Sequence, residues 1–236
     1  MEIGLLQCDH VRDSFQHILS DYDVAFKGLF QKYAPNLTLR VYDVCHGELP
    51  ESVSECDGYL ITGSGHSVYD DIDWIHNLAE FVRQAHAQEH KMVGICFGHQ
   101  MIAHALGGRV AKANSGWGIG VKTVDINQRK DWMQPTANTY QLLLSHQDQV
   151  LNLPDGGEKL AGNEHCPVSM FIVKNHMLGI QAHPEFTPDY AKALMNSREE
   201  RIGHEAIQQA TITLDSVTDE GLVSEWINAF FTTSDA

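Results

Sequence analysis

Long apolar runs and clustered basic residues are both lacking in this sequence of 236 residues. No run approaches the roughly 20 apolar residues that a membrane-spanning helix needs. Residues 1–8 lack a basic region and are predicted to form a strand rather than a signal peptide. Sixteen Lys and Arg stand against 31 Asp and Glu, a formal charge of −15, and two glutamates separate Arg198 from Arg201. Because nucleic acids and anionic membranes require clustered cations, we expect neither as a partner. The lack of a membrane-spanning run and of a signal peptide favours a cytoplasmic protein.

Paired cysteines and common metal-binding motifs are also absent. The five cysteines form no CxxC pair, and their odd number does not suggest a disulfide framework. The 14 histidines include no HExxH motif. Cys45-His46 and His165-Cys166 are adjacent pairs, a poor geometry for chelating one ion. We therefore predict no metal site.

Short apolar runs alternate with helical patterns in the first half of the chain. This alternation is typical of an α/β fold with a doubly wound, mostly parallel sheet and helices on both faces, a flavodoxin-like arrangement. Asp73 is the expected N-cap of the second helix. Strands are predicted at residues 3–8, 37–44, 58–62 and 91–96, and helices at 14–33, 73–89 and 98–106.

The second half changes to strands separated by short turns. We expect these strands to form a small antiparallel extension and then to return to the main sheet, before two helices close the chain. No linker or repeat interrupts the sequence, so residues 1–236 are predicted to form a single domain. The strands are predicted at 121–126, 142–144, 159–162, 169–173 and 178–182, and the helices at 189–209 and 219–231.

Cys96 lies between a predicted strand and a predicted helix, with Gly94 and Gly98 two residues away on either side. Flanking glycines let strand and helix approach closely, as a nucleophile elbow requires. The helix N-terminus would stabilise a thiolate at Cys96, and the N–H of Phe97 would serve as an oxyanion donor. Taken alone, this pattern also fits a buried cysteine between two packed glycines.

His183 and Glu185 are the candidate partners of this cysteine. They follow the apolar run 177–181, and the ends of parallel strands are where sites assemble. Pro184 stiffens the turn between them and would let the carboxylate reach back to the imidazole, the arrangement of a base and its orienting group. Alone this turn fits a structural role, but together with the elbow it favours catalysis.

Residues 94–100 and 183–185 together resemble the class I, triad-type, glutamine amidotransferase family. The resemblance spans residues 58–190 and includes residues 62–70, 105–108 and 145–150. It is nearest to a stand-alone branch similar to the amidotransferase domain of GMP synthase and to γ-glutamyl peptidases.

The resemblance implies a role for each motif residue. Cys96 would be the nucleophile, His183 the general base and acid, and Glu185 its orienting group. The oxyanion donors would be the N–H of Phe97 and, opposite it, an N–H of the loop 63–65, assigned to Gly65. Relatives often have Gly-Gly-Pro in this loop, so the donor is open by a residue or two. The implied substrate-binding residues are Gly63, Gln100, His146, Gln147 and Asp148.

The residues themselves leave several of these assignments open. A glycine-rich loop is often a simple turn. His146 and Asp148 also fit a hydrogen-bonded surface loop, whereas the resemblance implies that residues 146–150 close the pocket. Gln100 in the first turn of the helix fits either pocket lining or capping.

The assigned roles predict cysteine-dependent hydrolysis of a γ-glutamyl amide, either glutamine or a γ-glutamyl peptide, through a glutamyl thioester. This chemistry requires no metal or organic cofactor. No P-loop or second catalytic domain is visible, so the fate of the amine stays open. One hypothesis is a free-standing hydrolase of a small-molecule substrate, and a second is a glutaminase subunit that delivers ammonia to a separate synthase. A third is a catalytically silent binding or stress-response module on the same fold.

Overall fold

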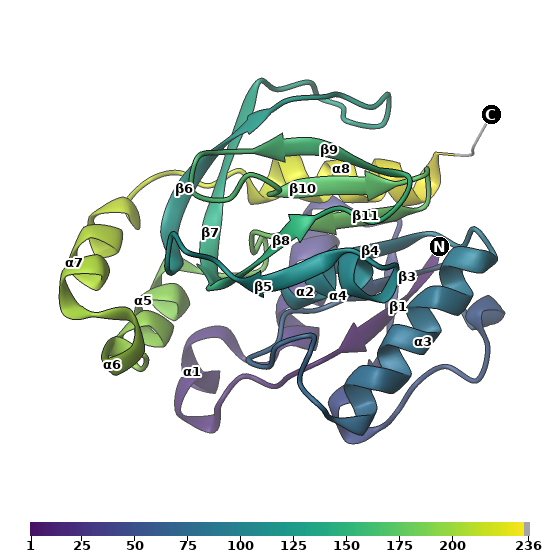
Figure 1. The fold of residues 1–236 in the computed structure, drawn as a ribbon, viewed down its shortest axis with the longest axis horizontal. Coiled ribbons are helices and arrows are strands. Elements are labelled where there is room, and N and C mark those ends of the chain that lie inside the picture. Colours follow the sequence, from purple (N-terminus) through teal and green to yellow (C-terminus); the bar gives the residue numbers. More distant parts are fainter. Residues whose placement is uncertain (234–236) are drawn as a thin grey trace.

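The computed structural model describes residues 1–233 and contains a mixed sheet of nine strands (Figure 1). The strand order is β2-β1-β3-β4-β11-β10-β9-β6-β7. The first five strands are parallel to one another, and three of them consist entirely of buried residues, as expected for strands covered on both faces. Their bounds are β1 Glu2–Gln7, β2 Thr38–Asp43, β3 Gly58–Ile61, β4 Met92–Ile95 and β11 Met177–Ile180.

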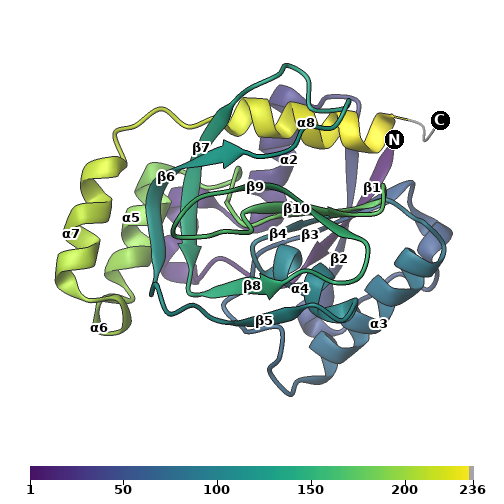
Figure 2. The ribbon, with the colours of Figure 1, turned by 45° about the horizontal axis from the view of Figure 1, so that its top comes forward.

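Helices cover both faces of this parallel part (Figure 2). Successive residues of a strand point to opposite faces. Leu5 packs in the core that α2 and α8 complete, whereas Leu6 packs in the core that α3 and α4 complete. The doubly wound α/β fold predicted from the sequence is thus confirmed. The bounds of these helices are α2 Tyr22–Tyr33, α3 Asp73–Ala87, α4 Phe97–Ala105 and α8 Glu220–Thr232.

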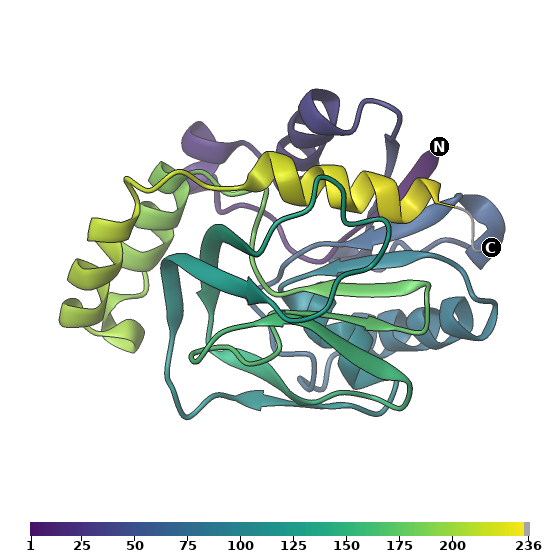
Figure 3. The ribbon, with the colours of Figure 1, turned by 90° about the horizontal axis from the view of Figure 1, so that it is seen from above.

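The other four strands of the sheet form the expected antiparallel extension. Helices α5, α6 and α7 lie together at this end of the molecule, where α5 and α7 contact β6 (Figure 3). Strands β6 and β7 are longer than predicted because they pair with each other over eight residues. The bounds are β6 Gly118–Ile126, β7 Thr139–His146, β9 Gly157–Gly162, β10 Met170–Val173, α5 Pro188–Asn196, α6 Glu199–Ile202 and α7 His204–Thr213.

A second, two-stranded sheet was not predicted. It pairs β5, Arg109–Lys112, with β8, Asp148–Asn152, in antiparallel orientation. Residues 146–150 are therefore not a surface loop: His146 ends β7, Asp148 begins β8, and both side chains are buried. Such short strands carry too little apolar periodicity to be recognised without their partner.

Two long helices predicted from the sequence are broken in the structure. Residues 14–33 form a 3-10 helix at Asp13–Phe15, then α1, Gln16–Leu19, and then α2. The break is Ser20, whose φ of 66° is not helical, and Asp21 caps the helix that follows. Residues 189–209 divide into α5, α6 and α7, and Gly203 with φ 94° separates the last two. The N-cap position of α3 is Ile72, which makes no side-chain capping hydrogen bond, and the predicted cap Asp73 is instead the first residue of the helix.

Among the residues that the structure describes, no helix combines the length and apolar character needed to cross a membrane. The single-domain organisation of residues 1–236 stays a prediction, and residues 234–236 lie outside the described part.

Candidate active site

Cys96 lies at the sharp turn between β4 and α4. Its φ of 52° and ψ of −98° are a strained conformation for a residue with a side chain. A Cβ added to Gly94 would clash with the carbonyl of Gly98, and a Cβ on Gly98 would lie 2.5 Å from the carbonyl oxygen of Ile61. The two glycines are therefore required for strand and helix to approach this closely. This is the backbone geometry of a nucleophile elbow.

The N-terminus of α4 begins directly after Cys96. Phe97 is the first helical residue, so its N–H has no acceptor within the helix. On the other side, the amide of Cys96 donates to the carbonyl of Ile180 in β11 at 2.9 Å. Cys96 is thus fixed between the central strands with its side chain at the positive end of a helix dipole.

His183 and Glu185 follow β11, and both are buried. The imidazole Nδ1 lies 2.8 Å from Oε1 of Glu185. The main-chain N–H of His183 donates to the carbonyl of Leu143 at 2.9 Å, and its ring stacks on Phe186 with centroids 3.8 Å apart. The hydrogen bond and the stacking together fix the position and the tilt of the imidazole ring. The direction in which its other nitrogen, Nε2, points is therefore fixed as well.

Gly63 shows that Cys96 and His183 lie next to each other. A Cβ built on Gly63 would lie 3.0 Å from Cε1 of His183 and 3.8 Å from Cβ of Cys96. The end of β3 thus packs against both side chains, and any larger residue at this position would displace the imidazole. The structure therefore brings the three residues expected from the sequence, Cys96, His183 and Glu185, into one site.

The charge state of His183 follows from its neighbours. Burial alone would lower its pKa, but the negative charges of Cys96 and Glu185 outweigh burial and raise the pKa to about 10. An imidazolium is therefore favoured at neutral pH. A proton held in this position is available to an amine that leaves from a carbonyl at Cys96.

A pocket opens above Cys96. Its walls come from the loop after β3, from α4, from the end of β5 and the residue before β6, from the junction of β7 and β8, and from α6 with the residue before it. Three cations and one carboxylate face it, although the whole chain carries a formal charge of −15. The lining residues are Ser64, Gly65, His66, Ser67, Cys96, Gln100, Lys112, Trp117, Ser145, His146, Gln147, Asp148, Arg198 and Arg201.

Gln100 and Asp148 are connected within this pocket. The side-chain amide of Gln100 donates to the main-chain oxygen of Asp148 at 2.9 Å and to the side chain of Gln181 at 3.1 Å. Of the two alternatives for Gln100, the structure therefore favours pocket lining over helix capping. The carboxylate of Asp148 accepts from the hydroxyl of Ser67 at 2.6 Å, which joins β8 to the loop after β3.

His146 and Gln147 lie in the same wall. Nδ1 of His146 is 3.0 Å from the main-chain oxygen of Asp148, and burial lowers its pKa to about 3, so this ring is neutral. The main-chain oxygen of Gln147 accepts from the N–H of Ala113 at 3.0 Å. All of the residues expected to contact substrate in this segment are thus at the pocket.

Gly65 lines the pocket, but its N–H donates to the carboxylate of Asp9 at 2.7 Å. It is therefore not free to hold an oxyanion in this arrangement. Ser64 is the neighbouring residue in the same loop, and within residues 1–233 no acceptor is found for its N–H.

The cationic side of the pocket was not predicted from the sequence. Arg198 donates to the hydroxyl of Ser145 at 3.0 Å, and both Arg198 and Arg201 lie over the ring of Trp117. The two glutamates between these arginines argue against a basic cluster in the sequence. Their spacing of three residues, which places both on one face of a helical turn, is the signal that could have revealed them.

Comparisons with known proteins agree with this arrangement. The family model for class-I glutamine amidotransferases matches residues 19–199. The chain is 32% identical over 157 residues to γ-glutamyl peptidase 3 of Arabidopsis thaliana, and the match covers 63% of each protein. It is 32% identical over 136 residues to one of the subunits of the glutamine-hydrolysing GMP synthase of Sulfolobus acidocaldarius, covering 57% of this chain and 70% of that one.

A solved structure of a glutamine amidotransferase from Thermotoga maritima has the same fold. It superposes with a TM-score of 0.78 at 18% identity, over 98% of this chain and 99% of the other. The match to the plant peptidase spans 63% of that relative's length.

Proposed function

The chain belongs to the class-I glutamine amidotransferase family, and on this premise we propose that it hydrolyses a γ-glutamyl amide through a thioester at Cys96. The substrate is either glutamine or a γ-glutamyl peptide. The observation that carries the proposal is the elbow cysteine beside an imidazole that Glu185 holds at 2.8 Å. These three residues form a nucleophile, a base and an orienting group.

In this mechanism the sulfur of Cys96 attacks the side-chain carbonyl carbon of the γ-glutamyl group. The N–H groups of Phe97 and Ser64 hold the resulting oxyanion; Ser64 takes the place expected for Gly65, whose N–H is donated to Asp9. His183 gives its proton to the leaving amine, and the C–N bond breaks. A water molecule, deprotonated by His183, then hydrolyses the thioester and restores the enzyme.

The pocket charges support a glutamyl substrate. The α-carbon of a γ-glutamyl group carries one ammonium and one carboxylate. Arg198 and Lys112 offer cations for the carboxylate, and Asp148 offers an anion for the ammonium. Gln100, which is fixed to the main chain of Asp148, would contact the same end of the substrate.

Two other functions use the same fold. A glutaminase that supplies ammonia to a separate synthase is supported by the similarity to the GMP synthase of Sulfolobus acidocaldarius, in which the matching protein is a subunit. A silent binding module would need no reactive cysteine, and the strained φ of 52° at Cys96 argues against it, because such strain is retained chiefly at functional sites.

The test is an assay of the purified chain with glutamine and with γ-glutamyl dipeptides, measuring ammonia or the released amino acid. Cleavage by the chain alone, abolished in Cys96→Ser, supports the free-standing hydrolase. Activity that appears only after a synthase is added would support the ammonia-supplying role instead. Cleavage that survives in Cys96→Ser would contradict the proposed mechanism.

A further inference from the structure

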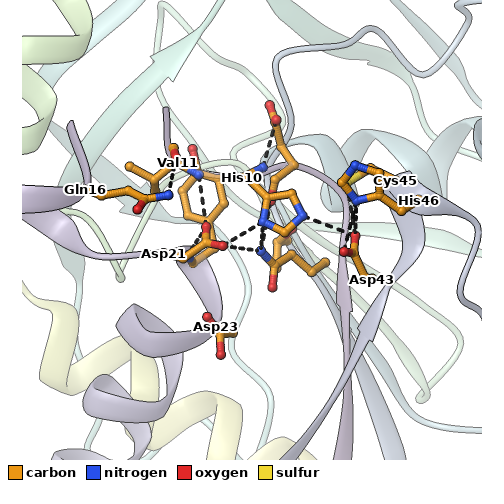
Figure 4. Close-up of polar contacts among 12 residues, drawn as sticks. His10, Val11, Gln16, Asp21, Asp23, Asp43, Cys45 and His46 are labelled. Atoms are coloured by element: carbon orange, nitrogen blue, oxygen red, sulfur yellow. Dashed lines mark hydrogen bonds and ion pairs between the residues drawn. The ribbon is translucent and has the colours of Figure 1, made fainter. Parts of the chain in front are cut away.

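A second group of reactive side chains lies where β1 and β2 end. His10 follows β1, while Asp43, Cys45 and His46 end or follow β2 (Figure 4). The two strands are parallel neighbours with Gln7 opposite Asp43. Side chains after each strand therefore meet at the same edge of the sheet, although 33 residues separate His10 from Asp43 in the chain.

The donor atoms of these four residues all lie within 4.8 Å of one another. Oδ1 of Asp43 is 3.2 Å from Nε2 of His10 and 3.3 Å from Sγ of Cys45. Nδ1 of His46 is 2.9 Å from Oδ2 of Asp43 and 3.9 Å from Sγ of Cys45. The group thus offers two nitrogens, one sulfur and one oxygen around a common centre.

These separations can be compared with those of a tetrahedral zinc site. Zn–N and Zn–O bonds of about 2.0–2.1 Å and Zn–S bonds of about 2.3 Å place neighbouring ligand atoms roughly 3.3–3.6 Å apart. The four separations given above, from 2.9 to 3.9 Å, are distributed around this range, and the remaining pairs lie within 4.8 Å. Small rotations of Asp43, Cys45 and His46 would therefore complete the geometry.

The surroundings of His10 have the features that commonly support a metal ligand. Its Nδ1 lies 2.6 Å from the carboxylate of Asp21, which is itself fixed by the N–H groups of Val11 and Tyr22 at 2.9 and 2.8 Å. A ligating histidine usually donates its second N–H to such a carboxylate. With that hydrogen on Nδ1, the lone pair of Nε2 would face the acceptor oxygen of Asp43, and a cation between the two would satisfy both.

We infer that His10, Asp43, Cys45 and His46 bind one Zn²⁺ ion. A shell of four protein ligands is closed, so the ion is structural rather than catalytic. It ties the segment after β1 to the segment after β2. The sequence predicts no metal here because the adjacent Cys45 and His46 are a poor chelating pair by themselves. Asp43 precedes them in the same segment, and the pairing of β1 with β2 adds His10.

The ion would also fix the neighbourhood of the active-site loop. Asp9, adjacent to His10, accepts the N–H of Gly65 at 2.7 Å. The inference does not depend on the proposed function, because the group is distinct from the pocket at Cys96.

The test uses the full chain carrying Cys96→Ser, so that the active-site thiol cannot bind the probe. The protein is stripped of metal and titrated with Co²⁺, and then with Zn²⁺ in competition. We expect one equivalent of tetrahedral Co²⁺ with a sulfur-to-cobalt charge-transfer band. Adding Cys45→Ala should remove that band, and adding His10→Ala should weaken binding more than about 10-fold. Asp21→Asn should weaken it about 10- to 100-fold without changing the ligands.

The matched control is His76→Ala. His76 is also an exposed histidine paired with an aspartate, at 2.9 Å from Asp71, and its loss should leave binding unchanged. Far-ultraviolet circular dichroism checks that each variant is folded. If His10→Ala does not fold, Asp21→Asn still tests the inference. Absence of stoichiometric binding, or a charge-transfer band that survives Cys45→Ala, would overturn the inference.

Discussion

Replacing Glu185 with glutamine should move the alkaline limit of activity to lower pH. Glu185 is buried and holds Nδ1 of His183 at 2.8 Å. Glutamine keeps the size of the side chain but removes its charge. The variant therefore separates the electrostatic role of Glu185 from its role in packing.

The size of the expected shift in the alkaline limit follows from the pKa of His183. Its pKa rises from 6.5 to about 10 although burial opposes the change, which corresponds to about 5 kcal/mol in favour of the imidazolium. Cys96 and Glu185 share this effect, and Cys96 has the larger part. Loss of Glu185 should thus cost roughly 2 kcal/mol, or about 1–2 pH units of the alkaline limb.

The raised pKa of His183 affects stability as well. Because this pKa is raised in the fold, the stabilisation by its partners is complete below pH 6.5 and is lost as the pH rises through about 10. Glu185→Gln should therefore lower the melting temperature most at neutral and acidic pH, and little at strongly alkaline pH.

The assay is kcat against pH for the wild type, Glu185→Gln and the exposed control Glu205→Gln. A glutamine at residue 185 should leave measurable activity, reduced about 10- to 100-fold at neutral pH, whereas His183→Ala should lose about 10⁴-fold or more. An alkaline limb that does not move relative to the control, or equal activity in Glu185→Gln and His183→Ala, would refute the assigned roles.

Two further predictions concern the elbow and the pocket. Gly98→Ala should destabilise the fold by about 3 kcal/mol in chemical denaturation, because its Cβ would lie 2.5 Å from the carbonyl oxygen of Ile61. Gly28→Ala, with open space around it in α2, should instead stabilise by about 0.5–1 kcal/mol, and equal effects would contradict the packing argument. Arg198→Met should raise KM for a γ-glutamyl substrate about 10- to 100-fold with a smaller change in kcat, whereas Arg83→Met should not; an unchanged KM would remove Arg198 from substrate binding.

The central features of the fold could be predicted because their signals are local. The apolar runs indicate parallel strands that are covered on both faces, so the doubly wound sheet could be predicted from the sequence. The glycines around Cys96 indicate a close approach of strand and helix, so the elbow could be predicted as well. The position of His183 also followed, because it comes at the end of a strand. In each case the physical cause lies within a few neighbouring residues.

One of the features that were not predicted is a local break in a helix, and the others depend on contacts between distant segments. The φ of 66° at Ser20 interrupts a helical pattern that is continuous in the sequence. Asp21 then caps α2, because its side chain accepts the N–H of Tyr22. The pairing of β5 with β8 buries Asp148, for which the sequence left a pocket position and a surface loop both open. Arg198 and Arg201 are separated by acidic residues in the sequence but share Trp117 in space.

The reactivity of Cys96 is tested most directly by a diazo-ketone analogue of glutamine. We expect one adduct per chain by intact-mass measurement, located on Cys96 by peptide mapping, slowed by excess glutamine or γ-glutamyl peptide and absent in Cys96→Ser. No adduct, or an adduct on one of the other four cysteines, would contradict the proposal that this chain forms a glutamyl thioester at Cys96.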